Sequence, residues 1–469
     1  MQTDLAIVGA GPAGLSAAIQ AAASGLKVVL LDEQPVPGGQ IYRNIEALAA
    51  TRPAQLQWLG PDYVAGLTLL RRFRDCGVEY LPLAQVWQVG EDGRVYYRRE
   101  GAVGIVHAQK VLIATGAMER PLPVPGWTLP GVMSCGAMQT LLKASGLAPE
   151  GRFVLAGCGP LLLLLAAQLI RAGRPPAALL ETSYDLWGAL PHLPGMLGLP
   201  AYLLKGLTLL REIRAAGVSF HRGVTSLKIK GPDRAREIEF ESGGRSFKEA
   251  VDLVFLHQGV VPNGNLALST DIRHQWNDLQ KCFCPELDTW GRSSSDTVRV
   301  AGDAGGIVGA VGAAAMGEVA GLTAAADLGR IKSAELDHRS AAARRVLARH
   351  RAARPFLDRL YRPQQQWLAP TDPDTVICRC EEIRAGDIRS LVAAQNCPGP
   401  NQLKSFMRCG MGPCQGRLCG LTAVELIAET RGQTPAEIGY YRIRAPIKPI
   451  TLGDMAALDV PSRHDAINT

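Results

Sequence analysis

The sequence predicts an α/β fold with two parallel-sheet units and a small cysteine-rich unit near the C-terminus. Three observations predict it: an apolar strand and a glycine-rich turn open the chain, a second unit of this kind begins at Phe153, and six of the eleven cysteines lie between Cys378 and Cys419. The length of 469 residues, with 47% hydrophobic and 20% charged residues, allows two to four packed domains and excludes a disordered chain.

The first unit runs from the apolar strand 5–8 through a glycine triplet and an alanine-rich helix to a second strand at 27–31. Gly9 permits the turn, Gly11 lets backbone N–H groups reach a pyrophosphate, and Gly14 allows close packing of helix and strand. A glycine triplet alone also occurs in purely structural turns, but the flanking strands and helix favour a dinucleotide site. The predicted nucleotide turn comprises Gly9, Ala10, Gly11, Pro12, Ala13 and Gly14.

Two acidic residues follow the second strand of this unit. Asp32 closes the strand, and a carboxylate at that position can accept hydrogen bonds from ribose hydroxyls. The neighbouring Glu33 could share this role or take it over. Both are therefore candidate ribose ligands.

The second unit runs from the strand 153–156 through Gly157 and Gly159 to a helix and a strand ending at Glu181. Leu162 stands where the third glycine of a nucleotide turn is expected, and its side chain hinders close packing of helix and strand. A vestigial Rossmann-like scaffold is the favoured interpretation. Binding of NAD(P) or another adenine nucleotide stays open.

A repeated segment links the two units. The six residues at 66–71 recur at 206–211, and Gly77 and Val78 recur as Gly217 and Val218 at the same offset. The two halves are therefore predicted to share one architecture.

The charge distribution argues against nucleic-acid binding. Ten basic and three acidic residues between Arg330 and Arg362 account for the whole net charge of +7, so the rest of the chain is balanced. A solvated or partner-facing helical connector is the better interpretation of this stretch. The uncharged runs 5–26 and 153–170 contain glycine turns and predict buried strand–turn–helix units. Since no signal-peptide pattern is visible, we expect a cytoplasmic protein, at most peripheral to a membrane.

Four motifs together resemble a flavoprotein of the glutathione and thioredoxin reductase type, with two dinucleotide domains. They are G-A-G-P-A-G, P-G-G-Q-I at 37–41, A-T-G at 114–116 and A-G-D at 301–303. The resemblance implies FAD, a discontinuous FAD domain at 1–125 and 255–330, and a second domain at 126–254. Beyond the first turn and the two acids, the implied FAD-binding residues are Gly38, Gly39, Gln40, Ala114, Thr115, Gly116, Gly302 and Asp303.

The residue chemistry agrees with this resemblance. Gly38 and Gly39 let the backbone lie against a flat ring, and Gln40 offers amide hydrogen bonds. Asp303 ends a short apolar strand and could bind a ribityl hydroxyl, or it could act only as a helix N-cap.

No reactive cysteine pair of the disulfide-reductase kind stands near the predicted flavin motifs. Cys135 and Cys158 are solitary, and Cys282 and Cys284 are interpreted as structural strand residues. The eight histidines show no metal or triad spacing, so no substrate acid or base is named.

Cysteines at two short loops predict a metal centre in a separate unit at 371–433. Four thiolates suit a [2Fe-2S] cluster, and they also suit structural Zn²⁺. The sequences I-C-R-C-E-E-I and R-C-G-M-G-P-C-Q-G-R-L-C resemble the bacterioferritin-associated-ferredoxin-like module. That resemblance implies a [2Fe-2S] cluster, leaves Cys409 and Cys397 as spares, and assigns the ligands as Cys378, Cys380, Cys414 and Cys419.

The connector at 331–370, the cysteine unit and a proline-rich tail at 434–469 complete the chain. As a set, these parts resemble the larger electron-transfer subunit of bacterial opine oxidases, hydroxyproline dehydrogenases and hydrogen cyanide synthase. The resemblance implies an FAD oxidoreductase subunit that receives electrons from a partner flavoprotein of the amino-acid-oxidase type. It also allows a small ferredoxin-like subunit and an FMN at a subunit interface. The alternative is a self-contained NAD(P)H-dependent FAD oxidoreductase that uses the turn at 157–162.

Overall fold

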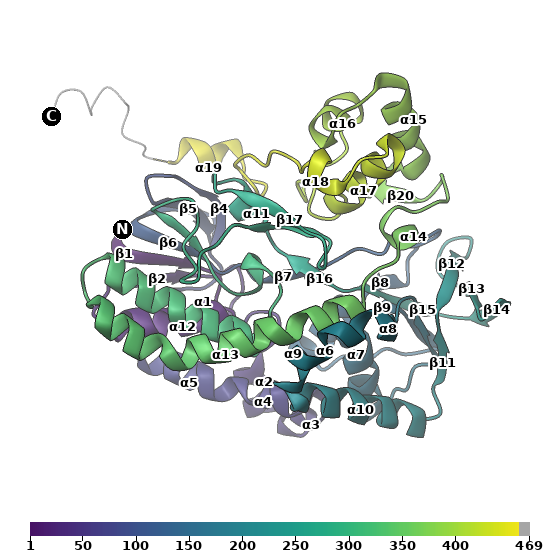
Figure 1. Cartoon of the computed structure of the whole chain (residues 1–469), viewed down its shortest axis with the longest axis horizontal. Helices are drawn as coiled ribbons and strands as arrows, with labels where there is room; N and C mark the ends of the chain where they lie inside the picture. The colour runs from purple at the N-terminus through teal and green to yellow at the C-terminus, as the bar shows by residue number, and fades with distance from the viewer. Residues whose placement is uncertain (459–469) are drawn as a thin grey trace.

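The computed structural model of the chain describes residues 1–458 and has the predicted α/β architecture (Figure 1). Its larger sheet is parallel on one side and continues into an antiparallel meander. The strand order across this sheet is β3 (Glu79–Leu81), β2 (Val28–Leu31), β1 (Gln2–Val8), β6 (Ala102–Ile113), β5 (Arg94–Arg99) and β4 (Gln85–Val89). A seventh strand, β19 (Val298–Val300), also pairs with β6. The central strands β1 and β2 are almost wholly buried because helices cover the sheet.

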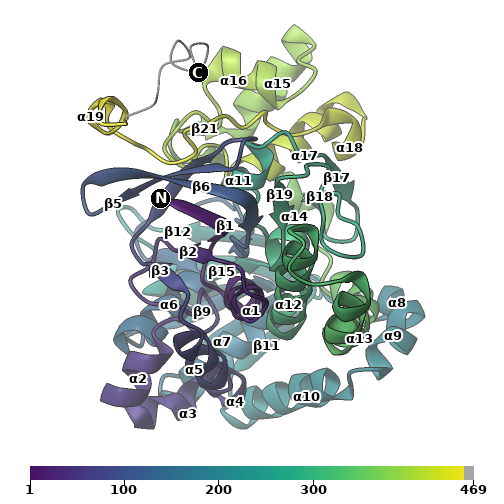
Figure 2. The ribbon, with the colours of Figure 1, turned by 90° about the vertical axis from the view of Figure 1, so that its left-hand side faces the viewer.

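Helices from the two ends of the first domain pack against each other on this sheet (Figure 2). The helix α1 (Pro12–Ala22) lies beside α12 (Gly309–Asp327), which in turn contacts α13 (Ser333–Leu360). A Cβ added to Gly317 would lie 2.0 Å from the carbonyl oxygen of Ala13, so the two backbones touch at this crossing. The close approach brings segments some 300 residues apart in sequence into one layer.

Short helices border the first domain on the opposite side from the meander. They are α2 (Ile45–Thr51), α3 (Leu56–Leu59), α4 (Pro61–Val64) and α5 (Gly66–Asp75). The short helix α11 (Asn265–Leu268) instead contacts β4 of the meander.

The smaller parallel sheet forms the core of the second domain. Its order is β11 (Ser219–Arg222), β10 (Ala178–Glu181), β9 (Phe153–Cys158), β15 (Leu253–Gln258) and β8 (Val132–Ser134). Because β15 pairs with both β9 and β8, its whole length belongs to this sheet. The second domain therefore ends after residue 258, a few residues beyond the expected boundary at 254. The associated helices are α6 (Cys135–Ser145), α7 (Pro160–Arg171), α8 (Leu186–Ala189), α9 (Leu193–Leu197) and α10 (Pro200–Ala215).

The repeated segment occupies equivalent places in the two domains. Its first copy forms α5 and leads to the edge strand β3, whereas its second copy lies in α10 and leads to the edge strand β11. The shared architecture predicted from the repeat is confirmed. Each copy supplies the helix that precedes the edge parallel strand of its sheet.

Small antiparallel ladders extend from these domains or connect them. The strands β7 (Ala117–Glu119) and β16 (Val260–Pro262) pair where the chain passes between the domains. The remaining ladders are β12 (Val224–Lys230), β13 (Glu237–Ser242) and β14 (Arg245–Ala250), then β17 (His274–Asn277) and β18 (Cys282–Pro285).

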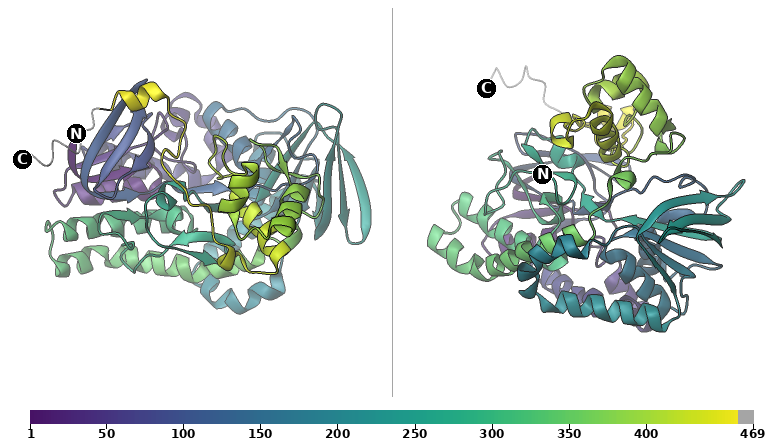
Figure 3. Two further views of the ribbon diagram at one scale, coloured as in Figure 1. Left: turned by 90° about the horizontal axis from the view of Figure 1, so that it is seen from above. Right: turned by 45° about the vertical axis from the view of Figure 1, so that its right-hand side comes forward.

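The cysteine-rich region forms a separate lobe above the two domains (Figure 3). The lobe has its own buried core, in which apolar residues of α15 and α17 pack around the cysteines. Its elements are α14 (Gln365–Leu368), β20 (Val376–Cys378), β21 (Ile383–Arg384), α15 (Ala385–Gln395), α16 (Pro400–Met407), α17 (Gly420–Arg431) and α18 (Pro435–Ile438).

The segment after the lobe crosses back over the first domain and ends in α19 (Leu452–Ala456) (Figure 3). Tyr441, Ile443 and Ile447 are buried in the core of the larger sheet. The expected extended tail is therefore fastened to another domain as far as residue 458, and residues 459–469 of that tail lie outside the described residues.

Both uncharged runs form buried strand–turn–helix units, β1–α1 and β9–α7. Within residues 1–458, α12 alone is long and apolar enough to cross a membrane by length and composition. Its most apolar window is 67% buried inside the protein, which is typical of a core helix.

Candidate functional site

The predicted flavin motifs converge at the carboxyl end of the larger sheet. Gly38 N donates to the carbonyl oxygen of Ala10 at 2.8 Å, and a Cβ on Gly39 would lie 2.8 Å from the Cα of Gly11. The two glycine-rich loops therefore touch through their backbones. Only glycine allows this approach, which leaves both loops able to face one extended ligand.

The third motif lies on the other side of the first turn. Gly9 has a φ of +109°, and a Cβ there would come within 2.4 Å of the carbonyl oxygen of Ala114. The hydroxyl of Thr115 donates to the carbonyl oxygen of Asn263 at 2.8 Å, and Asn263 N donates to Gly116 O at 2.9 Å. This motif therefore contacts both the nucleotide turn and Asn263, in the segment where the chain returns from the second domain to the first.

The fourth motif stands at the start of α12. A Cβ on Gly302 would lie 2.7 Å from the Cβ of Ala13. The Oδ1 atom of Asp303 accepts hydrogen bonds from Val308 N at 2.8 Å and Gly309 N at 3.0 Å, so its side chain holds the start of α12, although the N-cap residue is Val308. Burial raises the pKa of Asp303. Only one of its two carboxylate oxygens takes part in these two bonds.

The two candidate ribose ligands have different surroundings. Asp32 is buried, and its carboxylate accepts hydrogen bonds from Ala10 N at 2.5 Å and Gln34 N at 2.7 Å. Burial raises the pKa of Asp32. Glu33 is 48% exposed and forms an ion pair with Lys448 of the C-terminal segment. Asp32 therefore shapes the nucleotide turn directly, whereas Glu33 faces the tail.

The second glycine turn is covered by the chain itself. The thiol of Cys158, inside the turn, donates to the carbonyl oxygen of Tyr361 at 3.3 Å. Asp185 N donates to Leu360 O at 2.8 Å, and the Ser183 hydroxyl donates to the carbonyl oxygen of Arg362. A dinucleotide pyrophosphate normally lies on such a turn. The backbone at the end of α13 contacts this turn at Cys158 and the loop after β10 at Ser183 and Asp185.

The acid at the end of β10 is also covered. Glu181 is 2% exposed, and its Oε2 lies 3.2 Å from Nε of Arg222. Burial raises the pKa of Glu181 to about 7, although the Arg222 charge opposes the shift. Leu162, at the place of the third glycine, is fully buried. These contacts favour the vestigial interpretation of the second turn.

A histidine–glutamate pair lies beside the second turn and was not foreseen from the sequence. His257 Nδ1 lies 2.6 Å from Oε1 of Glu119, whose Oε2 accepts from Gly136 N at 2.7 Å. His257 is 1% exposed, and its Nε2 would lie 3.2 Å from a Cβ placed on Gly159. No spacing motif connects these residues, because they meet only through the pairing of β7 with β16, the strand that follows β15.

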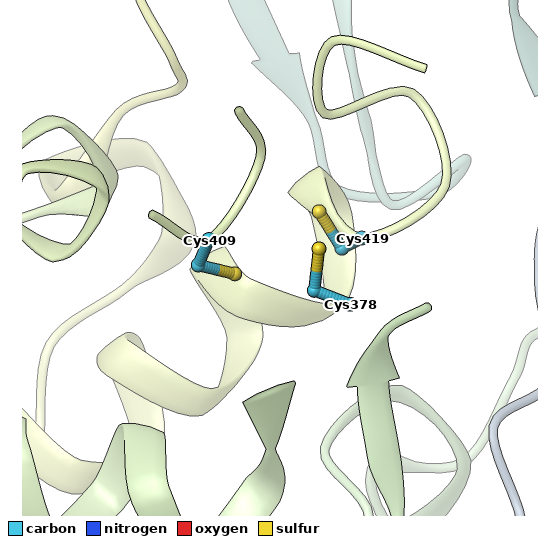
Figure 4. Close-up of side chains that lie close together, drawn as sticks. All are labelled: Cys378, Cys409 and Cys419. Atoms are coloured by element: carbon cyan, nitrogen blue, oxygen red, sulfur yellow. The ribbon is translucent and has the colours of Figure 1, made fainter. Parts of the chain in front are cut away.

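The lobe brings three buried thiols together, as Figure 4 shows. The sulfur atoms of Cys378, Cys409 and Cys419 all lie within 4.8 Å of one another. Cys378 ends β20 and Cys419 directly precedes α17, so the cluster faces the positive end of a helix. This arrangement favours thiolates.

The other two predicted ligands form a separate pair at the edge of the lobe. Cys380 Sγ and Cys414 Sγ lie 4.0 Å apart. A Cβ on Gly412 would lie 2.1 Å from the Cβ of Cys380, so glycine is needed for the two loops to meet. The structure thus brings the four predicted ligands together as two pairs and adds Cys409 as a fifth thiol. The sequence motif did contain Cys409, but spacing alone did not distinguish it.

Hydrogen bonds stabilise one anionic sulfur in the lobe, that of Cys378, whereas hydrogen bonding to Cys378 and burial raise the pKa of Cys409 and Cys419. Hydrogen bonds from the thiols of Cys409 and Cys419 and from backbone groups lower the pKa of Cys378 to about 2. Arg417 Nε donates to the carbonyl oxygen of Cys414 at 3.0 Å. A thiolate at this position is the form that binds iron or zinc.

Aromatic residues of the tail cover the thiol loops. The Tyr441 hydroxyl donates to the carbonyl oxygen of Cys409 at 2.9 Å, and a Cβ on Gly410 would lie 2.7 Å from the Tyr441 ring. Tyr440 packs against Phe283 of β18, with ring centroids 5.5 Å apart. Within the tail, Tyr441 therefore contacts the thiol loops and the preceding Tyr440 contacts the first domain.

Comparisons with known proteins agree with this arrangement. A family model described as pyridine nucleotide-disulphide oxidoreductase matches residues 3–317, and one described as the sarcosine oxidase A3 domain matches residues 376–459. The chain is 44% identical over 470 residues to the A subunit of an opine oxidase of Rhizobium meliloti, and the match covers 98% of this chain and 88% of that protein. It is 32% identical over 460 residues to the HcnB subunit of hydrogen cyanide synthase of Pseudomonas aeruginosa, covering 95% and 96%, respectively.

A solved structure supports the fold. L-proline dehydrogenase from P. horikoshii matches with a TM-score of 0.71 at 18% sequence identity, covering 97% of this chain and 79% of that chain. The relatives that are 44% and 32% identical confirm the family named from the sequence motifs. The chain is an FAD-dependent oxidoreductase that belongs to the pyridine nucleotide-disulphide oxidoreductase family and to its group of opine oxidase A subunits.

Proposed function

We propose that this chain is the flavin and iron–sulfur electron-transfer subunit of a heteromeric dehydrogenase or oxidase of bacterial type. A partner subunit would oxidise an amine or amino acid, of the opine, hydroxyproline or glycine-to-cyanide type. The observation that carries the proposal is the presence, in one chain, of a converged flavin-type loop site and, fastened beside it, a lobe in which five thiols form a cluster of three and a pair. The family relationship over 98% of the chain supports it.

The converged loops would hold FAD. Backbone N–H groups of Gly11 and its neighbours would face the pyrophosphate at the start of α1, and Asp32 with Glu33 would define the ribose end. Gly38, Gly39 and Gln40 would lie along the ring system, with Ala114, Thr115 and Gly116 closing the other side. Asp303 would place its second oxygen near the ribityl chain while the first holds α12. Bound FAD supplies the change from two-electron to one-electron transfer.

The thiol lobe would hold a [2Fe-2S] cluster. Each iron of such a cluster takes two cysteine ligands, and the structure offers the pairs Cys378–Cys419 and Cys380–Cys414. Cys409 would remain as a buried neighbour of the first pair. Structural zinc is the competing occupant, because thiolates at these distances also suit tetrahedral coordination.

Electrons would enter from the partner subunit and not from NAD(P)H. Tyr361 contacts the second glycine turn at Cys158, and Leu360 and Arg362 contact the loop after β10, beside the place where a nicotinamide dinucleotide would need to bind. A partner flavoprotein of the amino-acid-oxidase type provides the required donor. A small ferredoxin-like subunit and an FMN at the interface belong to the same proposal, as do a cytoplasmic location, at most peripheral membrane contact and the absence of nucleic-acid binding.

One purification tests these points. The chain is purified under anaerobic conditions, and FAD, iron and zinc per chain are determined together with the EPR spectrum after dithionite reduction. We expect bound FAD, an axial or rhombic [2Fe-2S] signal and no flavin bleaching by NADH. Zinc without iron would contradict the cluster, and rapid bleaching by NADH would favour the self-contained NAD(P)H-dependent oxidoreductase.

A further inference from the structure

One segment of the second domain exposes many large apolar side chains. The stretch 186–204, which spans α8, α9 and the start of α10, contains no Asp, Glu, Lys or Arg. Trp187 is 82% exposed and Leu204 is 64% exposed. The apolar face comprises the exposed leucine and tryptophan residues of the segment 186–207: Leu186, Trp187, Leu190, Leu197, Leu204 and Leu207. Such a concentration of exposed apolar groups marks an interaction surface.

The core beneath the apolar face is already filled by other side chains. Met196 of α9 is fully buried in a small core that also contains Phe356 of α13. A Cβ on Gly195 would overlap the carbonyl oxygen of Ala352, so α9 touches the backbone of α13 directly. The inner side of the segment is therefore closely packed, and the apolar face is surplus to the folding of this domain.

Arginines without acidic partners border the apolar face. Arg211 stands four residues after Leu207, so both lie on one side of α10, and Arg214 follows in the last turn of this helix. On α13, Arg345 and Arg349 precede the contact with α9 by one to two turns. These four arginines are exposed, and within residues 1–458 none of them forms an ion pair.

The acidic residues of the same helices are paired with other arginines. Glu212 of α10 forms an ion pair with Arg171 at 2.7 Å. The three acids of α13 are paired within the helix: Glu335 with Arg339, Asp337 with Arg344, and Asp358 with Arg354. The unpaired charge around the apolar face is therefore positive, which complements an anionic surface.

The location and composition of the apolar face suit a flat, extended partner. Figure 1 and Figure 2 both show α10 at the edge of the molecule opposite the thiol lobe. Pro191, Pro194 and Pro200 divide the segment into short helices, from which the leucines and Trp187 protrude. Leucine and tryptophan on helices bordered by arginine are typical of segments that lie in a membrane interface.

The inner side of α10 contacts the predicted flavin site. The hydroxyl oxygen of Tyr202 would lie 3.8 Å from a Cβ placed on Gly309, whose N–H donates to Oδ1 of Asp303 at 3.0 Å. The same helix therefore carries part of the apolar face on one side and contacts the loop of the fourth flavin motif on the other.

We propose that the apolar face and its bordering arginines dock this protein on an anionic phospholipid bilayer. Trp187 and the leucines would insert at the level of the headgroups, and the four arginines would contact lipid phosphates. Docking would place α10, and the flavin motif beneath it, beside the bilayer. The inference gives a surface to the peripheral membrane contact included in the proposed function, and it requires neither the FAD site nor the iron–sulfur cluster.

Vesicle binding by the purified holoprotein tests the proposal. Vesicles of phosphatidylglycerol and phosphatidylcholine in equal amounts are compared with vesicles of phosphatidylcholine alone, at low and high salt. We expect binding to the anionic vesicles that weakens as the salt concentration rises, and binding to the neutral vesicles that is weaker by roughly tenfold or more. Bromine-labelled acyl chains should quench the fluorescence of Trp187, and Trp187→Phe should lose this quenching.

Substitutions separate the two parts of the surface. Leu204→Glu and Trp187→Ser should each weaken binding by roughly tenfold or more, because an inserted apolar group is lost. Replacing Arg345 and Arg349 together by glutamine should weaken binding to anionic vesicles by roughly thirtyfold. Leu452→Glu is the matched control, because Leu452 is 85% exposed on α19 and lies outside the apolar face. It should bind like the unmodified chain.

Four results would overturn the proposal. Two of them are the absence of binding to anionic vesicles and equal binding of Leu204→Glu and the unmodified chain. A dimer that Leu204→Glu converts into a monomer, with no vesicle binding, would assign the apolar face to a second copy of this chain. Vesicle binding by the chain alone that is lost in the complex with its partner subunit would assign the face to that subunit.

The same samples distinguish a failure of this proposal from a failure of the proposed function. Circular dichroism reports the folding of each variant, and exposed substitutions of this kind change stability little. FAD and iron contents are determined before the vesicles are added. A colourless or iron-free protein would contradict the cofactor sites, whereas the vesicle measurement would still decide the role of the apolar face.

Discussion

The ammonium group of Lys448 lies 2.7 Å from Oε2 of Glu33, so the C-terminal segment is tied to the tip of a strand 415 residues earlier. Ile447, the preceding residue, is buried in the core of the larger sheet, and its N–H donates to the carbonyl oxygen of Trp87 at 3.0 Å. The tail is thus held by one exposed ion pair and by buried apolar contacts.

These two kinds of contact should differ in strength. Lys448→Ala should lower the free energy of unfolding by less than about 1 kcal/mol, because exposed ion pairs contribute little. Ile447→Ala should cost about 2–5 kcal/mol through the lost burial and the cavity that remains. Urea denaturation of both variants measures the difference, and equal costs would show that the tail is not held by its apolar side chains.

The crossing of α1 and α12 depends on glycine. Gly317→Val should destabilise the protein by several kcal/mol and weaken FAD retention, because a Cβ would lie 2.0 Å from the Ala13 carbonyl oxygen. Gly206→Ala is the control, since no atom lies within 4 Å of its added Cβ on α10, and it should be neutral or stabilise by up to about 1 kcal/mol. Thermal unfolding and flavin release report both effects. An unchanged Gly317→Val protein would contradict the close crossing.

The five thiols of the Cys378–Cys409–Cys419 cluster and the Cys380–Cys414 pair should not be equivalent. Serine at Cys378, Cys380, Cys414 or Cys419 should abolish the EPR signal and most of the bound iron, because each would supply one ligand. Cys409→Ser should keep the iron while altering the signal, since this thiol contacts the Cys378–Cys419 pair.

The matched control for these variants is Cys397→Ser. Cys397 is buried in the same lobe, and its thiol donates to the carbonyl oxygen of Gly399 at 3.4 Å. It should retain full iron. Loss of iron from Cys409→Ser but not from Cys414→Ser would show that Cys409 is a cluster ligand and that Cys414 is not.

Burial of Glu181 predicts a pH-dependent stability. Its pKa is raised from 4.5 to about 7 in the folded chain, so between these values the native state holds a proton that the unfolded state has lost. The contribution of this group is present below pH 4.5 and is lost as the pH rises through about 7, by roughly 3 kcal/mol at most.

Glu181→Gln keeps the shape but removes this titration. Urea denaturation at several pH values should give a free energy of unfolding that falls less steeply between pH 4.5 and 7 than in the unmodified chain. Parallel curves would show that Arg222 keeps the carboxylate ionised throughout this range.

Local sequence signals were sufficient wherever neighbouring residues determine the structure. The turn at Gly9 to Gly14, the two βαβ units and the helix after Cys419 follow from apolar periodicity and from backbone positions that only glycine fits. The same signals placed the four predicted cysteine ligands in two loops of one lobe.

Other features depend on contacts between segments distant in sequence. Tyr361 was expected in a connector, but only the fold places its carbonyl oxygen on the Cys158 turn. Cys282 and Cys284 were interpreted as strand residues, and nothing in their spacing indicated that Gly306 and Leu421 would lie on either side of them.

The sequence by itself determined the family, the α/β class and the residue types available for a flavin and a metal centre, because these reside in short motifs with fixed backbone requirements. The tertiary structure decided that the second turn is covered, that Cys409 joins the thiol cluster and that Glu119 meets His257. Such pairings arise from strand order and domain packing, in which the free energy of burial is summed over many residues and no local pattern records the partner.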